Sequence, residues 1–209
     1  MKKLLRKLTA VVSAAAVAIA GVNFGGIGGL NLTARAETPG TLDISAGSIV
    51  ITATGYTVGG GAETAYMGDY TITGSTETNT ITVKKDVSAN ITLSGVTIDV
   101  SKTSGACAFK IEDNSKGDVT ITLADDSVNT LSSGYKCAGL QKNGDGADIG
   151  KLTIQGGTNG TGKLTSKGNV NFGAGIGGGD EGSTSNIKIT GGTVTASGSY
   201  GGAGIGGGK

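Results

Sequence analysis

The heptapeptide Gly-Ala-Gly-Ile-Gly-Gly-Gly occurs twice in this chain, at 173–179 and again at 202–208. Its glycine spacing matches the dinucleotide-binding pattern, but that site needs a helix directly after the turn and an acidic residue about 20 positions further on. Here a segment rich in Ser and Thr follows, and Gly198 stands where the acidic residue is required. Because the motif returns together with its flanking residues, it is better explained as a structural repeat.

Short runs of alternating β-branched residues fill the chain after Pro39, separated by Gly, Ser, Asn and Asp. Alternation with a period of two, bounded by turn formers, predicts β-strands, and no window beyond the first 36 residues has a helical period. We expect strands at 48–52, 70–73, 80–83, 90–93, 96–100, 119–123, 151–154, 187–190 and 193–196. The sequence therefore predicts an all-β fold.

Three kinds of strand recur in a fixed order, once in about 30 residues. The first kind carries Ile91, Ile121, Leu152 and Ile187; the second lies at 129–131, 163–165 and 193–195; the third carries Phe109, Leu140, Ile176 and Ile205. Three short strands per coil, stacked coil on coil, define a parallel β-helix. We expect the first and third sets to form two internal ladders, with coils about 4.8 Å apart. The alternative is an antiparallel sandwich with strands roughly every 8–12 residues, and the fixed order favours the solenoid.

Residues 1–36 have the layout of a secretory signal peptide. Four basic residues within 1–7 precede an apolar run at 8–20, and Ala34-Arg35-Ala36 offers a small-x-small cleavage site. A retained membrane span is the alternative, which the glycines and asparagines after residue 20 disfavour. No segment of 37–209 is apolar enough to span a bilayer. We therefore expect a secreted, extracellular protein without a transmembrane anchor in that part.

The remaining chain is expected to divide into a capping segment and regular repeats. Residues 37–80 fit the repeat poorly, because the linker at 59–68 has no later counterpart, and a solenoid needs an atypical element at its end. Residues 81–209 carry the parallel β-helix repeats. Since 202–209 is the third strand of a coil, the sequence predicts an open strand edge there and a chain that continues beyond Lys209.

Charge and composition limit the partners of the mature chain. Five of the 17 Lys and Arg lie in 1–36, so the remaining 12 face 16 acidic residues and the net charge becomes −4. No basic excess remains to neutralise phosphates, and nucleic acid is not an expected partner. The mature chain would also contain no Arg, His or Trp. The absence of His removes the commonest acid–base and metal-binding side chain, and the absence of Arg removes the side chain that binds anions best.

Several segments together resemble one family of bacterial secreted proteins, described as carbohydrate-binding domain-containing proteins. They are Tyr70–Gly74, Asn90–Leu93, Cys107–Phe109, Ala138–Gln141, Ile189–Thr195 and the two heptapeptides, and the likeness covers nearly all of 41–209. The resemblance implies a right-handed parallel β-helix, exported to or beyond the surface of anaerobic, often gut, bacteria. It also implies binding of plant polysaccharides such as cellulose or polygalacturonate, with calcium on the solenoid. We expect such a polysaccharide, or a cell-surface glycan, as the partner.

Three aromatic residues are the candidate carbohydrate-binding residues. Tyr135, Phe172 and Tyr200 precede the third strand of three successive coils, at nearly the same turn. One ring per step of about 4.8 Å forms a column on which a polysaccharide can stack. The alternative is an aromatic ladder that only packs the turn.

A second column is acidic and is the candidate calcium site. Asp113, Asp145 and Asp180 follow the third strand of successive coils, with Glu112, Asp148 and Glu181 close by. Stacked carboxylates and turn carbonyls supply the oxygen ligands that Ca²⁺ prefers. The alternative is that aspartate is simply common in turns.

Catalysis is not expected. Asp125 and Asp126 are adjacent, and consecutive side chains of a strand point to opposite faces, so the two carboxylates need not converge. A two-carboxylate glycosidase needs a suitably spaced partner, and a lyase of this fold would need Lys in place of the usual Arg. We therefore expect a non-catalytic protein; the alternatives are a structural or adhesin-like surface repeat without sugar specificity and, less favoured, a polysaccharide lyase.

Cys107 and Cys137 are the only cysteines and stand 30 residues apart, about one coil. Adjacent coils bring Cα atoms to about 4.8 Å, within bridging range, and secretion permits a disulfide. The strand alignment, however, places Cys107 opposite Ala138, and a slip of one residue turns Cys137 to the other face. A bridge and a pair of separate thiols both stay open.

Overall fold

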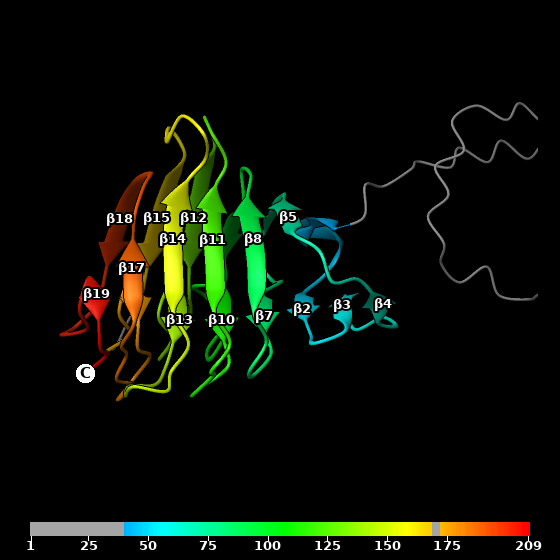
Figure 1. Ribbon diagram of the computed structural model, residues 1–209. Coiled ribbons are helices and arrows are strands. Elements are labelled where there is room, and N and C mark those ends of the chain that lie inside the picture. Colours follow the sequence, from blue (N-terminus) through cyan, green and yellow to red (C-terminus); the bar gives the residue numbers. More distant parts are fainter. Residues whose placement is uncertain (1–39, 169–171) are drawn as a thin grey trace, which may run out of the picture. The chain divides into compact units, whose positions relative to one another are not determined.

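Three sheets run side by side along Gly40–Lys209, and the chain passes from one to the next in every coil (Figure 1). The computed structural model describes residues 40–168 and 172–209, so the expected signal peptide at 1–36 lies outside the described residues. Apart from one short 3₁₀ turn at Ile44–Ala46, the described elements are all β-strands.

The first sheet contains, in spatial order, β1 (Thr41–Asp43), β5 (Tyr70–Thr73), β8 (Ala89–Leu93), β11 (Val119–Leu123), β14 (Leu152–Gly156) and β17 (Ile187–Ile189). The second contains β19 (Ile205–Gly206), β16 (Ile176–Gly177), β13 (Leu140–Lys142), β10 (Phe109–Ile111), β7 (Ile81–Val83), β2 (Ile49–Ile51), β3 (Gly55–Val58) and β4 (Thr64–Ala65). The third contains β18 (Thr193–Ser197), β15 (Lys163–Lys167), β12 (Val128–Ser132), β9 (Thr97–Asp99) and β6 (Ser75–Thr76). Neighbours pair in parallel except at β2–β3 and β3–β4, which confirms the predicted parallel β-helix.

The ladder predicted for the third kind of strand is confirmed. Phe109 pairs with Leu140, Leu140 with Ile176, and Ile176 with Ile205. The same ladder continues toward the N-terminus through Ile81 and Ile49. Except at the last coil these side chains are buried, so one inward residue per coil builds the core as a stack.

The ladder predicted for the first kind of strand is confirmed for Ile91 with Ile121 and for Leu152 with Ile187, but its middle step was wrong by two residues. Val119, and not Ile121, pairs with Leu152, while Ile121 pairs with Ile154. The turn between β13 and β14 is two residues longer than the turn between β10 and β11. Because side chains alternate with a period of two, this shift leaves the same face inward.

For the second kind of strand, the predicted alignment of 163–165 with 193–195 is confirmed, but that of 129–131 with 163–165 was wrong by one residue. Asn129 pairs with Leu164, not with Lys163, and its side chain is fully buried. Asn129 Oδ1 accepts a hydrogen bond from Val96 N at 2.9 Å, and Nδ2 donates to Ser127 Oγ at 2.9 Å and to Lys163 O at 3.0 Å. Since these bonds satisfy the amide, a polar side chain is tolerated inside the coil.

The N-terminal end of the solenoid is covered. In the segment where we expect the cap, β3 and β4 fold back beside β2 in antiparallel pairing. Tyr56, Tyr66 and Tyr70 meet edge to face, with ring centroids 5.3–6.3 Å apart. Edge-to-face packing is a favoured aromatic geometry. Leu42 and Ile44 in the first coil are consequently buried.

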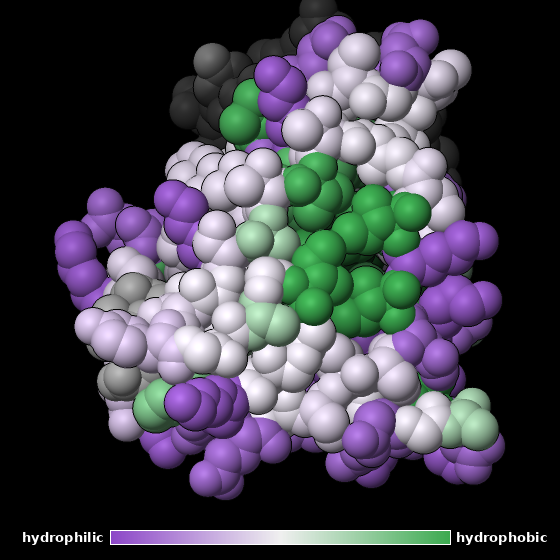
Figure 2. Space-filling view, turned by 90° about the vertical axis from the view of Figure 1, so that its left-hand side faces the viewer, coloured by the Kyte–Doolittle hydropathy of each residue, from purple (hydrophilic) through white to green (hydrophobic). Residues whose placement is uncertain are grey.

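The C-terminal end is open. The strands β17, β18 and β19 each pair with a neighbour on one side only. Their inward residues are less covered than in earlier coils: Ile189 is 39% exposed and Ile205 is 48% exposed. Figure 2 shows a cluster of hydrophobic side chains on this end of the molecule.

The repeated heptapeptide forms a corner and the short strand that follows it. A Cβ on Gly173 would collide with the carbonyl of Cys137 in the preceding coil, and a Cβ on Gly175 would collide with the backbone of the following coil. Glycine is therefore required there because adjacent coils approach too closely for any side chain. The motif is scaffold and not a nucleotide loop.

Candidate functional site

The three candidate aromatic residues do not occupy one column. Leu140, Ile176 and Ile205 pair in successive coils. Counting back three residues from each gives Cys137, Gly173 and Gly202 as equivalent positions. Phe172, one residue earlier, therefore corresponds to Lys136 and not to Tyr135. Its backbone agrees, with φ of 74° for Phe172 and 68° for Lys136. The turn before β16 is one residue longer than the turn before β13, and this displaces the phenylalanine.

Tyr135 and Tyr200 do hold equivalent positions, two coils apart. Tyr200 is 72% exposed and Tyr135 is 39% exposed. Within the described residues neither ring contacts the other or Phe172, but Lys136 Nζ lies 5.5 Å from the ring centroid of Tyr135. The turns thus present two separate rings about 10 Å apart along the axis.

Lysines accompany two of the three candidate calcium ligands. Asp180 forms an ion pair with Lys136 at 2.7 Å, and Asp113 forms one with Lys110 at 3.5 Å, while Asp145 is exposed. The hydrogen bond that the Lys136 ammonium donates to Asp180 raises the pKa of Lys136. In the ranges that the structure describes, no three His, Cys, Asp or Glu side chains gather to hold a metal ion.

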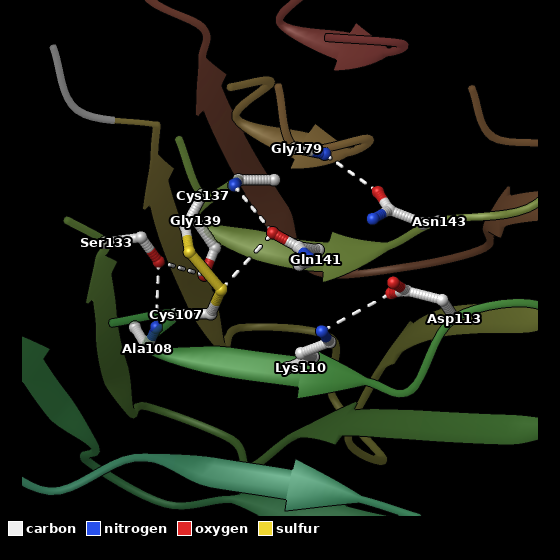
Figure 3. Close-up of a disulfide and its surroundings, with 11 residues drawn as sticks. Cys107, Ala108, Lys110, Asp113, Ser133, Cys137, Gly139, Gln141, Asn143 and Gly179 are labelled. Atoms are coloured by element: carbon white, nitrogen blue, oxygen red, sulfur yellow. Dashed lines mark hydrogen bonds and ion pairs between the residues drawn. A yellow bond between two sulfur atoms is a disulfide. The ribbon is translucent and has the colours of Figure 1, made fainter. Parts of the chain in front are cut away.

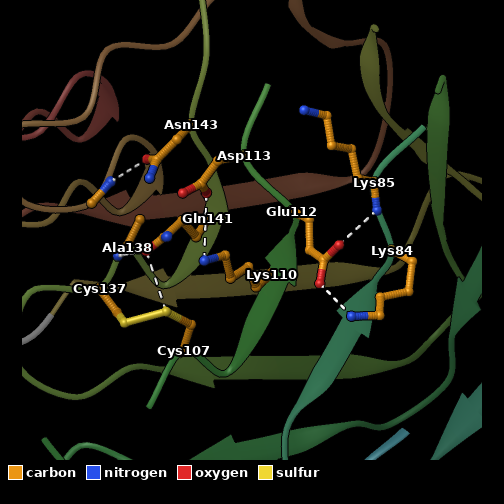
Figure 4. A network of polar contacts seen from close by, with 11 residues as sticks. Lys84, Lys85, Cys107, Lys110, Glu112, Asp113, Cys137, Ala138, Gln141 and Asn143 are labelled. Carbon is orange, nitrogen blue, oxygen red and sulfur yellow. Dashed lines mark hydrogen bonds and ion pairs between the residues drawn. A yellow bond between two sulfur atoms is a disulfide. The ribbon is translucent and has the colours of Figure 1, made fainter. Parts of the chain in front are cut away.

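Glu112 illustrates how this acidic edge is neutralised (Figure 4). Its carboxylate accepts hydrogen bonds from Lys84 Nζ at 2.7 Å and from the backbone N of Lys85 at 2.9 Å. Lys84 first, and then the Lys85 amide, lower the pKa of Glu112. Glu112, Asp113 and Asp180 therefore have partners within the chain, which reduces the repulsion that would favour a bound cation.

Cys107 and Cys137 form a disulfide, with Cα atoms 5.2 Å apart (Figure 3). Both cysteines lie in the turns before β10 and β13, outside the paired strand residues. The one-residue offset that the strand alignment predicts between them therefore does not prevent the bridge. Gln141 Oε1 lies 3.3 Å from Cys107 Sγ and accepts a hydrogen bond from Ala138 N at 3.3 Å. Ser133 Oγ accepts a hydrogen bond from Ala108 N at 2.8 Å. The bridge thus fastens two coils beside the turn that presents Tyr135.

The acid pair of the sequence does not form a convergent site. Asp125 accepts hydrogen bonds from the backbone N of Asn159 at 2.9 Å and of Thr161 at 3.3 Å. These bonds, led by that from Asn159, lower its pKa. The backbone N of Asp126 donates a hydrogen bond to the Thr161 hydroxyl oxygen, and Asp126 has a φ of 59°. Asp125 therefore orders a turn of the next coil.

A groove of about 440 Å³ opens near the N-terminal end of the solenoid. The loop 66–69 forms one wall, and the turn 86–88 with the starts of β8 and β11 forms the other. Tyr66 is half-buried, and its hydroxyl donates to Asp69 O at 2.9 Å. Met67 is 85% exposed at the rim. The wall therefore offers aromatic and thioether surface to a ligand.

Polar side chains line the other side of the groove. Asn90 Nδ2 donates to Asp69 Oδ1 at 3.0 Å, and Asn90 is adjacent to Thr120 in the next coil. Asp118 accepts at Oδ1 from the backbone N of Lys151 at 2.7 Å, and Asp86 accepts from the backbone N of Lys116 at 2.8 Å. These bonds orient carboxylate, amide and hydroxyl groups around one opening.

Sequence reasoning missed this groove because the expected cap was given no function. One signal was present: Tyr56, Tyr66 and Tyr70 are three of the five tyrosines in the chain and fall within 15 residues. A concentration of rings in a chain with 4% aromatic residues marks the region where large side chains pack or bind.

No family model, curated protein or solved structure matches this chain. Within 40–168 and 172–209, no helix is long and apolar enough to cross a membrane. The case for function therefore rests on the fold and on the groove.

Proposed function

We propose that this protein is an exported, non-catalytic polysaccharide-binding module that acts on or outside a bacterial cell. The observation that carries the proposal is the groove, in which the loop with Tyr66 and Asp69 lies opposite Asn90 and Thr120. Sugar rings have apolar C–H faces and hydroxyl edges, so an aromatic wall facing polar side chains suits them. Export is supported by the leader-like sequence at 1–36 and by the disulfide, since such bridges persist in oxidising compartments.

A polymer fits better than a single sugar because the polar row extends beyond the groove. On the outer face of the first sheet, Asn90, Thr120, Thr153 and Lys188 follow one another in paired register. Coils repeat about every 4.8 Å, so this row runs along the solenoid axis. A long glycan that starts in the groove can continue along the row.

Binding to insoluble polysaccharides tests the proposal. The mature chain and the variants Asn90→Ala and Tyr66→Ala are compared in pull-downs with a panel of insoluble glycans. We expect Asn90→Ala to weaken retention several-fold without changing the melting temperature, because Asn90 is exposed. Tyr66→Ala removes the wall, and circular dichroism checks that the variant is folded.

The double variant Tyr135→Ala/Tyr200→Ala is the matched control, since it removes two exposed rings from another edge. Undiminished retention of the control together with loss in Asn90→Ala supports the groove. Loss of glycan retention in the control variant alone would place the binding site at the turns that carry Tyr135 and Tyr200. Failure of the parent protein to bind any glycan would refute the proposed function.

A structural or adhesin-like surface repeat is the second candidate, and the regular stacking of coils through parallel strands favours it. Such stacking builds an extended support in which each coil contacts only its neighbours. This role predicts no glycan retention in the pull-down. A lyase would instead release unsaturated products from polygalacturonate, which absorbance at the double bond would detect.

Calcium remains part of the proposal as a stabilising ion on the acidic turns around Asp113, Asp145 and Asp180. A ligand that binds only the folded state raises the melting temperature with its concentration. We therefore expect excess chelator to lower the melting temperature of the parent chain. An unchanged melting temperature would remove the ion from the proposal.

A further inference from the structure

The groove carries three carboxylates, from Asp69, Asp86 and Asp118. None of them forms a salt bridge with a described lysine, in contrast to Glu112, whose partner is Lys84. All three side chains are exposed. The groove therefore faces solvent with a concentrated negative charge.

No lysine is among the residues that line the groove. The hydrogen bonds that the Asp86 and Asp118 carboxylates accept from the next coil fix them at the opening. A polyuronate such as polygalacturonate would bring further negative charge into this field and would be repelled. The electrostatics of the groove thus disfavour one of the two polysaccharides that the family resemblance implies.

We propose that the groove selects a polysaccharide with protonated amino groups, a partly or fully deacetylated amino-sugar polymer, over neutral and polyanionic glycans. The proposal rests on the proposed function, because it names the substrate class of the same site. Each ammonium group would donate to a carboxylate of Asp69, Asp86 or Asp118, while Tyr66 and Met67 contact the apolar faces of the sugar rings. The ionised carboxylates act as acceptors, and their hydrogen bonds to ammonium donors are stronger than those to neutral hydroxyls.

Retention is measured on four insoluble supports: deacetylated chitin, fully acetylated chitin, cellulose and calcium-free crosslinked polygalacturonate. We expect the strongest binding on deacetylated chitin, and a decline as salt rises from 50 to 500 mM, because exposed charge pairs are screened. In the variants Asp86→Asn and Asp118→Asn, each lost carboxylate should weaken binding about two- to fivefold.

An acidic protein can adhere to any polycation, so net charge needs its own control. The variants Asp126→Asn and Asp148→Asn remove the same charge from exposed positions outside the groove. Equal losses in the control and groove variants would overturn the proposal as non-specific attraction.

Two further outcomes separate the proposal from the proposed function. Retention on cellulose or acetylated chitin equal to that on the deacetylated polymer, and unaffected by Asp118→Asn, would overturn the charge selection but leave polysaccharide binding intact. Absence of retention on all four supports would refute both.

Discussion

Loss of the disulfide between Cys107 and Cys137 should cost a calculable part of the stability. The bridge closes a loop of 30 residues, which is one coil of the solenoid. In the chain-entropy account, crosslinking a loop of this length destabilises the unfolded chain by about 3.6 kcal/mol at 25 °C. Because the solenoid has a thin core, this is a large fraction of the roughly 5–15 kcal/mol typical of folded proteins.

The perturbation is the double variant Cys107→Ala/Cys137→Ala, and the assay is urea unfolding followed by circular dichroism. We expect the free energy of unfolding to fall by about 2–4 kcal/mol. Reduction of the unchanged protein should produce a similar fall, whereas reductant should leave the double variant unaffected. If neither reduction nor substitution changes the free energy of unfolding by more than about 0.5 kcal/mol, the reasoning is refuted.

Three further predictions concern the interior and are measured by urea unfolding. Asn129→Ala leaves the Val96 N–H without its acceptor and should cost about 2–4 kcal/mol; a cost below about 0.5 kcal/mol would contradict this role. Burial lowers the pKa of Lys142 from its ordinary 10.5, so the unfolded chain binds more protons and stability should rise with pH up to that value. Lys142→Met should therefore raise stability at pH 7 by about 1 kcal/mol and flatten that rise, and an unchanged pH profile would count against it. Gly175→Ala collides with backbone and should cost about 1–3 kcal/mol, whereas Gly204→Ala, the same motif position in the open coil, should cost much less; equal costs would contradict the packing argument.

The repeat and its third strand were predictable because their inward residues are apolar and evenly spaced. One step of the first ladder, from Ile121 to Leu152, was not predictable, since the extra two residues before Leu152 keep the same face inward and leave the alternation unchanged. The alignment of 129–131 with 163–165 failed for another reason. Asn129 and Ser166 are fully buried polar residues, so the expected pattern of apolar residues inward is interrupted where the coil satisfies polar groups internally.

The candidate sites depended on details that a linear pattern does not contain. One added residue in a turn moved Phe172 away from the position of Tyr135. The lysine partners of Asp113 and Asp180 come from the same or the preceding coil, and their approach depends on turn geometry. The groove arises where the loop 66–69 lies beside later strands, a long-range contact whose one sequence signal is the concentration of tyrosines at 56–70.

The two heptapeptides have a consequence for how such a protein changes in length over evolution. Every coil meets the next through the same kind of parallel ladder, so each contact is defined between neighbours only. Duplication of one coil-length stretch of the gene would insert one complete coil and would leave the contacts within the other coils unchanged. The copies at 173–179 and 202–208, identical in all seven residues, have the form that such an event would leave. A closed globular core could not accept 30 additional residues in this way.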